Sequence, residues 1–255
     1  TVGASPIKHK SGFQWNVTFN VAKNKNVVKS LYDKLDNYEL GSYWDLKVLA
    51  IPNKPFGSLY GYDFARNDEG KVIHVDGLPV QGNLKVLGNY TPDWVCGLNN
   101  EFQFKNITFS FLIDARWGGD IYSMTTTWGR YSGVLEETLT GREGGIIGKG
   151  VKQLPNGTWA ENDIVVSAEE YNKAAYSSNV AYSSIFDASF IKLREVRLGY
   201  TFQKLGNTGI TDLTLAIVGR NLALLYAKVP HIDPETAFSN SNVKGLEFGQ
   251  LPSAR

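Results

Sequence analysis

Strict alternation of apolar and polar side chains is the feature that most constrains this chain. In residues 12–23, GFQWNVTFNVAK, every second residue from Phe13 to Val21 is apolar, and the residues between them are polar. Successive side chains of a β-strand point to opposite faces, so this segment predicts a strand with one apolar and one polar face. In a soluble sandwich a second sheet covers the apolar face. In a membrane barrel lipid covers it, and the polar face lines an aqueous interior.

The same alternation recurs as a hairpin pattern over residues 95–119. Apolar residues share one face on both sides of a tight turn predicted at Lys105 and Asn106, and polar residues occupy the other face. Asn100 interrupts the apolar face. The opposite face carries charged residues, so we do not expect a wholly apolar core on that side.

A second hairpin pattern covers residues 195–222, with a Gly-Asn turn between its two alternating segments. Arg194 and Glu195 break the phase of the apolar residues before them, which predicts a β-bulge. Weaker strand patterns occupy residues 43–51 and 58–66. Together these segments predict about seven strands.

The connections between these strands alternate in length. Short connections fall near residues 52–57, 105–106 and 203–209, and long ones fall near residues 23–41, 67–92, 118–187 and 223–250. Bacterial outer membrane barrels have short periplasmic turns and long extracellular loops, whereas a sandwich gives no reason to place all long loops at one end. The sequence therefore predicts an all-β fold, namely part of an antiparallel, up-and-down transmembrane β-barrel with long extracellular loops.

Composition excludes several other classes of protein. The formal net charge is +1 and no dense stripe of Lys or Arg occurs, so nucleic acid is not an expected partner. Cys96 is the only cysteine, which excludes an intramolecular disulfide framework. No run of about 18 apolar residues exists to form a transmembrane helix, and residues 1–10 lack the apolar core of a signal peptide. We expect either a protein that is not exported or an internal piece of a longer one.

No sequence pattern supports catalysis, a metal site or a cofactor. The histidines His9, His74 and His231 are far apart and form no H-E-x-x-H motif. No G-x-S-x-G elbow is present, and GGIIGKG at residues 144–150 lacks the spacing of a phosphate-binding loop. Paired carboxylates, as in residues 233–235, could serve a glycosidase in principle, but adjacent loop charges are usually only solvated. We therefore predict no enzyme, no metal and no cofactor.

The long segment after residue 117 carries the candidate ligand-binding residues. They are Trp117, Asp120, Tyr122, Trp128 and Arg130. Aromatic faces and charged hydrogen-bonding groups suit sugars or peptides, and packing of the loop against a barrel mouth is the alternative role. Further on, residues 167–176 predict a short helix capped by Ser167, with Glu170 three residues later.

Several ordered stretches resemble one protein family. They are DASFIKLREVRLGYTF at 187–202, VGRNLALL at 218–225 and DPETAFSN at 233–240, preceded by PFGSLYGYDF at 55–64, residues 87–123 and TGREGG at 140–145. This ordered set covers most of the chain. It resembles SusC/RagA-type TonB-dependent outer membrane transporters.

The resemblance implies a barrel of about 22 strands in the cell outer membrane of Bacteroidetes, which imports large nutrients, either glycans or peptides. It implies a SusD-like surface lipoprotein as a lid, outer membrane lipid around the barrel, and coupling to the TonB complex through an amino-terminal part. Residues 1–255 would form the carboxy-terminal part of the barrel. The plug domain, the amino-terminal strands and the closing strand would then lie outside this chain. The sequence does not name the nutrient.

If the polar face lines the barrel lumen, five of its charged residues are expected to help hold the plug. They are Glu101, Asp114, Arg116, Arg197 and Arg220. The main rival is a secreted β-sandwich that binds carbohydrate, and an all-β glycosidase is a more distant third. Burial of the apolar face against a second sheet of this chain would favour the sandwich, whereas an uncovered face with two open strand edges would favour the barrel.

Overall fold

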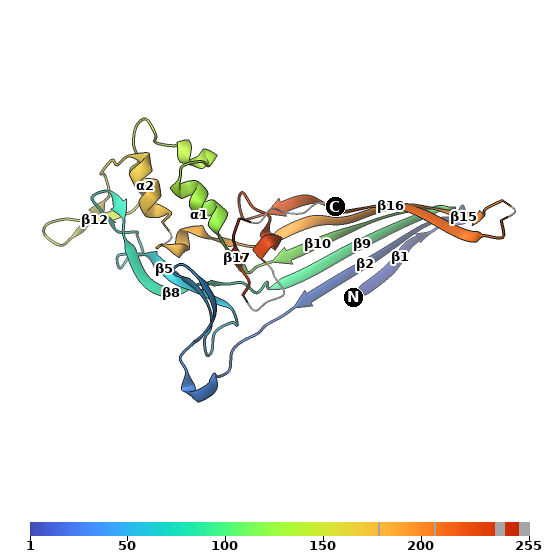
Figure 1. Ribbon diagram of the computed structural model, residues 1–255, viewed down its shortest axis with the longest axis horizontal. Coiled ribbons are helices and arrows are strands. Elements are labelled where there is room, and N and C mark those ends of the chain that lie inside the picture. The colour runs from blue at the N-terminus through green and yellow to red at the C-terminus, as the bar shows by residue number, and fades with distance from the viewer. Residues whose placement is uncertain (178, 207, 238–242, 250–255) are drawn as a thin grey trace.

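Six strands form one antiparallel sheet, the long sheet, which is the extended arm in Figure 1. The computed structural model describes residues 1–177, 179–206, 208–237 and 243–249. The order of the strands is β1-β2-β9-β10-β15-β16. Their bounds are β1 Val2–Lys8, β2 Phe13–Lys23, β9 Trp94–Phe104, β10 Ile107–Trp117, β15 Phe190–Lys204 and β16 Thr211–Ala227.

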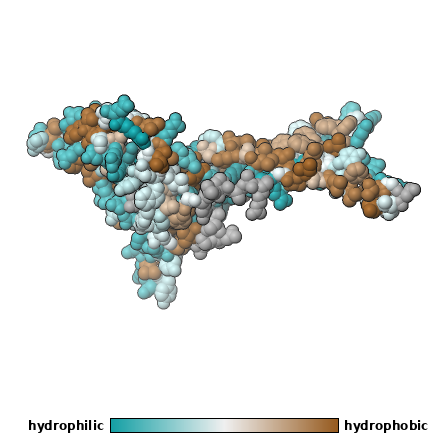
Figure 2. All heavy atoms as spheres, turned by 45° about the horizontal axis from the view of Figure 1, so that its top comes forward, coloured by the Kyte–Doolittle hydropathy of each residue, from teal (hydrophilic) through white to brown (hydrophobic). Residues whose placement is uncertain are grey.

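The register of the long sheet brings the predicted apolar residues into rows on one face. One row runs across five strands through Trp15, Phe102, Phe109, Leu198 and Ile217. Leu198 is 52% exposed and Ile217 is 80% exposed, and Figure 2 shows hydrophobic side chains along much of the arm. In the described part of the chain, no second sheet pairs with or covers this face. The predicted alternation is confirmed, and its apolar face is uncovered.

Local features of the long sheet agree with the sequence predictions. Phe104 pairs with Ile107, and Lys105 has a positive φ of 52° in the tight turn between β9 and β10. The pairing of β15 with β16 shifts register between Leu193 and Glu195, which confirms the predicted bulge. Part of the predicted Gly-Asn turn lies outside the described residues.

Strand β1 was not predicted from the sequence. Its pairing with β2 shifts register between Ala4 and Ile7, on either side of Pro6. Proline cannot donate a ladder hydrogen bond, but it is tolerated on edge strands and at bulges. Pro6 therefore interrupts the sequence pattern of a strand while still allowing the strand to form. Residues 9–12 therefore form a short connection at the same end of the sheet as residues 105–106.

The two weaker strand patterns are real strands, but they lie outside the long sheet. They form β4 (Leu46–Ala50) and β5 (Ser58–Phe64), which join β3 (Tyr38–Tyr43) and β8 (Gln81–Asn89) in a separate four-stranded sheet. In β4, Leu46, Val48, Leu49 and Ala50 are all at most 3% exposed. A strand buried on both faces cannot divide its sides between lipid and water, so the expected connector at 52–57 belongs to this sheet.

The remaining short elements gather at one end of the long sheet (Figure 1). The helices are α1 Met124–Tyr131, α2 Ala168–Ala175 and the 3-10 turns η1 Tyr32–Lys34, η2 Glu136–Leu139, η3 Ala181–Ser184 and η4 Pro234–Ala237. The strands are β6 His74–Val75, β7 Leu78–Pro79, β11 Asp120–Ser123, β12 Val151–Gln153, β13 Trp159–Glu161, β14 Ile185–Asp187 and β17 Leu246–Glu247. The Ser167–Glu170 capping box of α2 is present as predicted.

The main hydrophobic core lies among these loop elements. Leu46, Val48 and Leu59 of the four-stranded sheet pack there with Tyr122 of β11 and Leu246 of β17. Segments that are far apart in the sequence are thereby fixed against one another at the loop end. Within the described ranges, no helix is both long and apolar enough to cross a membrane.

Candidate functional site

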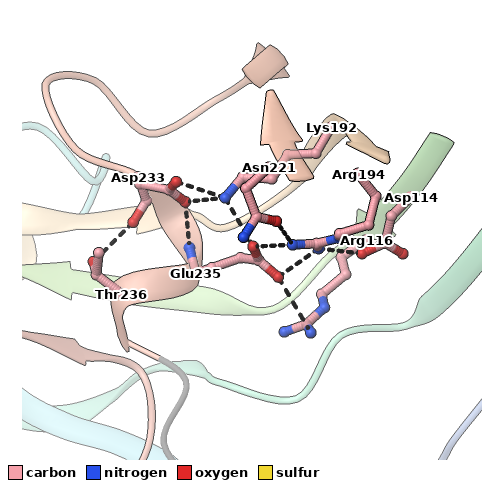
Figure 3. Close-up of polar contacts among 8 residues, drawn as sticks. All are labelled: Asp114, Arg116, Lys192, Arg194, Asn221, Asp233, Glu235 and Thr236. Atoms are coloured by element: carbon pink, nitrogen blue, oxygen red, sulfur yellow. Dashed lines mark hydrogen bonds and ion pairs between the residues drawn. The ribbon is translucent and has the colours of Figure 1, made fainter. Parts of the chain in front are cut away.

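A charged network lies on the polar face of the long sheet, at its loop end. The Lys192 Nζ lies 2.5 Å from Asp233 Oδ2 and 2.8 Å from Glu235 Oε2. Arg194 donates to Glu235 Oε1 at 2.7 Å and also pairs with Asp114. Figure 3 shows both carboxylates of the 233–235 segment pointing toward the strands. The network therefore fixes the segment after β16 back across the polar face.

The bulge in β15 assembles the strand side of this network. Lys192 pairs with Asp114 across the sheet, and Arg194 contacts the same aspartate. Beyond the shift in register, Glu195 lies opposite Leu112 and Arg220 on the polar face. Because a bulge inserts one extra residue, two consecutive polar residues lie on one face while the apolar alternation resumes afterwards.

The charges in this network compensate one another. Lys192 is only 5% exposed, so its charge depends on the two carboxylates beside it. Burial alone would raise the pKa of Glu235, but hydrogen bonds from Arg194 and Lys192 lower it to about 2. Glu235 is therefore ionised at neutral pH, and the segment is held by complete ion pairs.

All five predicted lumen residues lie on the polar face, and three of them have charged partners in this chain. Asp114 and Arg116 join the network, with Arg116 lying 3.6 Å from Glu235. Arg220 pairs with Glu195 at 2.9 Å. These partners belong to the loop end and to neighbouring strands, so contact with a plug stays a prediction.

The other two predicted lumen residues lie nearer the turn end of the sheet. Glu101 accepts a hydrogen bond from Asn16 at 3.3 Å. Ser110 pairs with both Glu101 and Arg197, which places these two charges in one row of the polar face.

The five predicted ligand-binding residues do not form one site. Tyr122 is 2% exposed in the hydrophobic core, and its hydroxyl accepts a hydrogen bond from Thr127 at 3.2 Å. Asp120 accepts a hydrogen bond from the Asn89 backbone, and its burial raises its pKa. Arg130 pairs with Glu137. Packing of the loop describes these three residues better than ligand contact does.

The two tryptophans of that set remain on the surface but lie in different places. Trp117 stacks on Tyr226 with ring centroids 6.1 Å apart, and Lys228 lies over its ring at 5.0 Å. Trp128, in α1, is 46% exposed. It belongs to a cluster that the sequence analysis did not identify.

This cluster, the aromatic row, links three distant segments. Its rings follow one another in the order Phe248, Tyr43, Trp44, Trp128 and Tyr131, with neighbouring centroids 4.8, 4.5, 5.2 and 5.6 Å apart. Trp44 occupies the turn between β3 and β4 with a positive φ of 50°. The adjacent aromatic residues at 43–44 could have indicated this cluster from the sequence. The predicted strand over residues 43–51, however, included the residues that form the turn. The row offers an aromatic surface suited to sugars or peptides.

The part of the chain that the structure describes contains no group of three or more His, Cys, Asp or Glu residues placed to hold a metal ion. The features described above are ion pairs that hold residues 233–235 against the long sheet and the exposed aromatic row.

Comparisons with known proteins agree with the fold. No family model matches the chain. The chain is 24% identical to TonB-dependent receptor P3 of Formosa agariphila over 95% of its length, and 24% identical to the TonB-dependent receptor SusC of Bacteroides thetaiotaomicron over 100% of its length. It spans about a quarter of these curated relatives, 26% and 24% of their lengths.

Solved structures show the same likeness. The RagAB peptide importer in the closed-closed state matches with a TM-score of 0.63 at 15% sequence identity, over 99% of this chain and 27% of that chain. The open-open state of the same importer matches with a TM-score of 0.62 at 16% identity, over 99% of this chain and 26% of that chain. At this identity the likeness concerns the fold.

The matched proteins are TonB-dependent receptors, SusC among them, and the fold is similar to that of the RagAB importer. The resemblance predicted from the ordered motifs is confirmed, and so is the predicted localisation in the outer membrane. The relatives are named as receptors and not as enzymes.

Proposed function

We propose that this chain is the carboxy-terminal barrel part, residues 1–255, of an outer membrane transporter that imports a large nutrient, either a glycan or a peptide. The observation that carries the proposal is the long sheet. Among the described residues, its apolar face is uncovered and its outer strands β1 and β16 leave two open edges. In an up-and-down barrel of about 22 strands, lipid covers that face and further strands pair with both edges.

The lengths of the connections support a membrane orientation. Strands β1 and β2, and likewise β9 and β10, are joined by short turns at one end of the long sheet. At the other end, residues 24–93 and 118–189 form long folded insertions. Short connections are periplasmic and long ones extracellular in outer membrane barrels, so the loop elements would face outward, where a SusD-like lipoprotein and the nutrient would meet them.

The polar face would line the barrel interior. The charged network would hold residues 228–237 against the wall near the extracellular mouth. On the rest of the polar face, Glu101, Arg197 and Arg220 would contact a plug, with Arg220 also paired to Glu195. Coupling to the TonB complex would require parts of the transporter outside this chain. The proposed role is therefore gated transport, with no chemistry of its own.

A secreted β-sandwich is less well supported because the apolar face has no covering sheet among the described residues. An all-β glycosidase also lacks support, since Asp233 and Glu235 are engaged in ion pairs with Lys192 and Arg194. Their carboxylates are committed to holding a segment of the chain.

The test uses the full-length protein in its native cell. We expect the protein to fractionate with the outer membrane after carbonate and salt washes, and deletion of its gene to abolish uptake of one class of glycan or peptide from a labelled mixture. Reintroduction of the gene restores uptake, and a version unable to engage TonB does not. Recovery in the soluble fraction, or unchanged uptake of every glycan and peptide tested, would contradict the proposal.

A further inference from the structure

A polar pocket of about 730 Å³ lies between the C-terminal end of α1 and the N-terminal end of α2. Three parts of the chain line it: the end of α1 and its cap, α2, and the loop between the two helices. The lining residues used here are Tyr131 and Ser132, then Glu169, Asn172 and Lys173, then Thr138 and Arg142. Its volume is in the range of pockets that hold small organic ligands. The TGREGG stretch at 140–145, which has no role in the barrel wall, supplies the arginine.

Asn172 offers its side-chain amide to a ligand in the pocket. The residue is only 8% exposed and lines the pocket. Among the described residues, the amide group of its side chain makes no hydrogen bond. The amide atoms are not among the fully buried side-chain atoms that lack a partner, so they are open to solvent in the pocket. Two donor hydrogens and an acceptor oxygen are therefore available to a bound molecule with hydroxyl or carboxylate groups.

Arg142 brings a positive charge to the pocket and forms no ion pair with a carboxylate within the described ranges. Its Nε donates to the Thr138 carbonyl at 3.1 Å, and its terminal nitrogen donates to the Gly133 carbonyl and, at 3.3 Å, to the Thr138 hydroxyl. These neutral acceptors orient the guanidinium and leave its charge intact. Lys173 is a second cation of the lining, and it pairs at 2.6 Å with Glu169, which also lines the pocket, so the net positive charge of the lining is that of Arg142. An arginine of this kind suits a carboxylate.

The aromatic row reaches the rim of the pocket. Tyr131 lines the pocket and packs edge-on against Trp128, with ring centroids 5.6 Å apart. Trp128 in turn contacts Trp44 at 5.2 Å. A ligand that extends out of the pocket would therefore meet exposed aromatic rings.

We propose that this pocket binds an acidic oligosaccharide. Its carboxylate pairs with Arg142, its hydroxyls hydrogen-bond to the Asn172 amide, and a sugar ring at the rim contacts Tyr131 and Trp128. The hydroxyl-bearing and amide-bearing walls match a ligand rich in hydroxyls, which favours a sugar over an acidic peptide. The inference rests on the proposed function, in which these loops face the nutrient, and it narrows the nutrient to a uronate-containing glycan.

The test measures binding to the purified full-length transporter in detergent by calorimetry. The probes are a trigalacturonate, the matched neutral galactose trisaccharide and a triglutamate peptide. We expect the trigalacturonate to bind tightest and its affinity to fall with added salt. Arg142→Gln should weaken it by at least about tenfold and abolish most of the salt dependence, because a charge-assisted hydrogen bond is lost.

Two further variants keep the test decisive if Arg142→Gln disturbs its loop. Asn172→Leu removes an amide with no internal partner, so it should leave folding intact and weaken binding of the trigalacturonate. Lys149→Gln, a charge change at an exposed site outside the pocket, should bind as the wild type does. Retained affinity in Asn172→Leu, equal binding of the neutral sugar, tighter binding of the peptide or no binding of any probe would overturn the assignment. If the protein fractionates with the outer membrane but binds no probe, only this inference is contradicted. If it is soluble and binds the trigalacturonate, only the proposed function is contradicted.

Discussion

At the scale of single residues, the structure explains the one polar interruption of the apolar face. Asn100 lies on the apolar face of the long sheet but is only 6% exposed. Its Oδ1 accepts a hydrogen bond from Trp15 Nε1 at 3.2 Å. An amide surrounded by apolar groups is costly without such a partner. The indole therefore stabilises a polar side chain on a face that we assign to lipid.

This contact predicts a specific pattern of mutant stabilities. Trp15→Phe keeps an aromatic ring but removes the donor, so it should lower the free energy of unfolding of the full transporter by about 1–3 kcal/mol. Adding Asn100→Leu removes the unsatisfied amide and should recover most of that loss. The measurement is urea unfolding in lipid vesicles. A double variant no more stable than Trp15→Phe would show that the amide is not the cause.

At the scale of elements, the β9–β10 hairpin separates its two environments residue by residue. Phe111 lies on the apolar face, where its ring is 6.2 Å from that of Phe102. Its neighbour Ser110 lies on the polar face opposite Glu101 and Arg197. Adjacent positions of one strand are therefore expected to tolerate opposite kinds of side chain.

Arginine substitution tests this difference. Phe111→Arg should lower the free energy of unfolding of the full transporter by about 2–4 kcal/mol, as a cation near the bilayer midplane does, whereas Ser110→Arg should be tolerated. Both variants would be folded into vesicles and compared by denaturant titration. Equal losses at the two positions would count against lipid on one side and water on the other.

The segment after β16 depends on ionised Glu235. Its folded pKa of about 2 lies below the ordinary value of 4.5, so the unfolded state binds more protons. The stabilisation is therefore complete above about pH 4.5 and is lost as pH falls toward 2. We expect a protease site introduced at residues 228–232 to become more accessible over this pH range.

Glu235→Gln should mimic the acid state at neutral pH. In this variant Lys192 keeps an ion pair only with Asp233, and Arg194 loses its ion pair with residue 235. The free energy that favours the docked segment should therefore fall, by less than the roughly 3–5 kcal/mol typical of breaking a fully buried pair. The same protease assay at pH 7 measures the change. Glu161→Gln, at an exposed residue in β13, is the matched control and should leave cleavage unchanged.

At the scale of the whole molecule, the two open edges set the limits of stability. Among the described residues, β1 and β16 each have a strand neighbour on one side only, and the buried hydrophobic clusters lie outside the long sheet's apolar face. Neither lipid nor water favours such a sheet in isolation. Stability of the barrel wall should therefore depend on strands supplied by the rest of the transporter.

The isolated chain is accordingly expected not to fold as a soluble monomer. When residues 1–255 are expressed alone, we expect aggregation or recovery only in denaturant, whereas the same residues within the full transporter should resist heat and protease. Size-exclusion chromatography and circular dichroism distinguish the outcomes. A monodisperse soluble monomer with cooperative unfolding would contradict the open-wall interpretation.

The sequence alone determined those features that depend on neighbours a few residues away. The two faces of β2, β9, β10 and β15 follow from a period of two, the bulge at Arg194 follows from a break in that period, and the cap of α2 follows from Ser167 and Glu170. It also carried the ordered motifs of the transporter family. These signals are local, so the sequence contains them without reference to the fold.

Only the tertiary structure decided which surfaces meet. Pro6 interrupts the alternation of β1, so this strand is recognised only from its pairing with β2. Strands β4 and β5 belong to a separate sheet because their core includes Tyr122 and Leu246 from elsewhere in the chain. The ion pairs of Lys192 with residues 233–235 likewise join positions about forty residues apart. Such contacts depend on how long insertions pack at one end of the sheet, and periodicity along a strand carries no information about that packing.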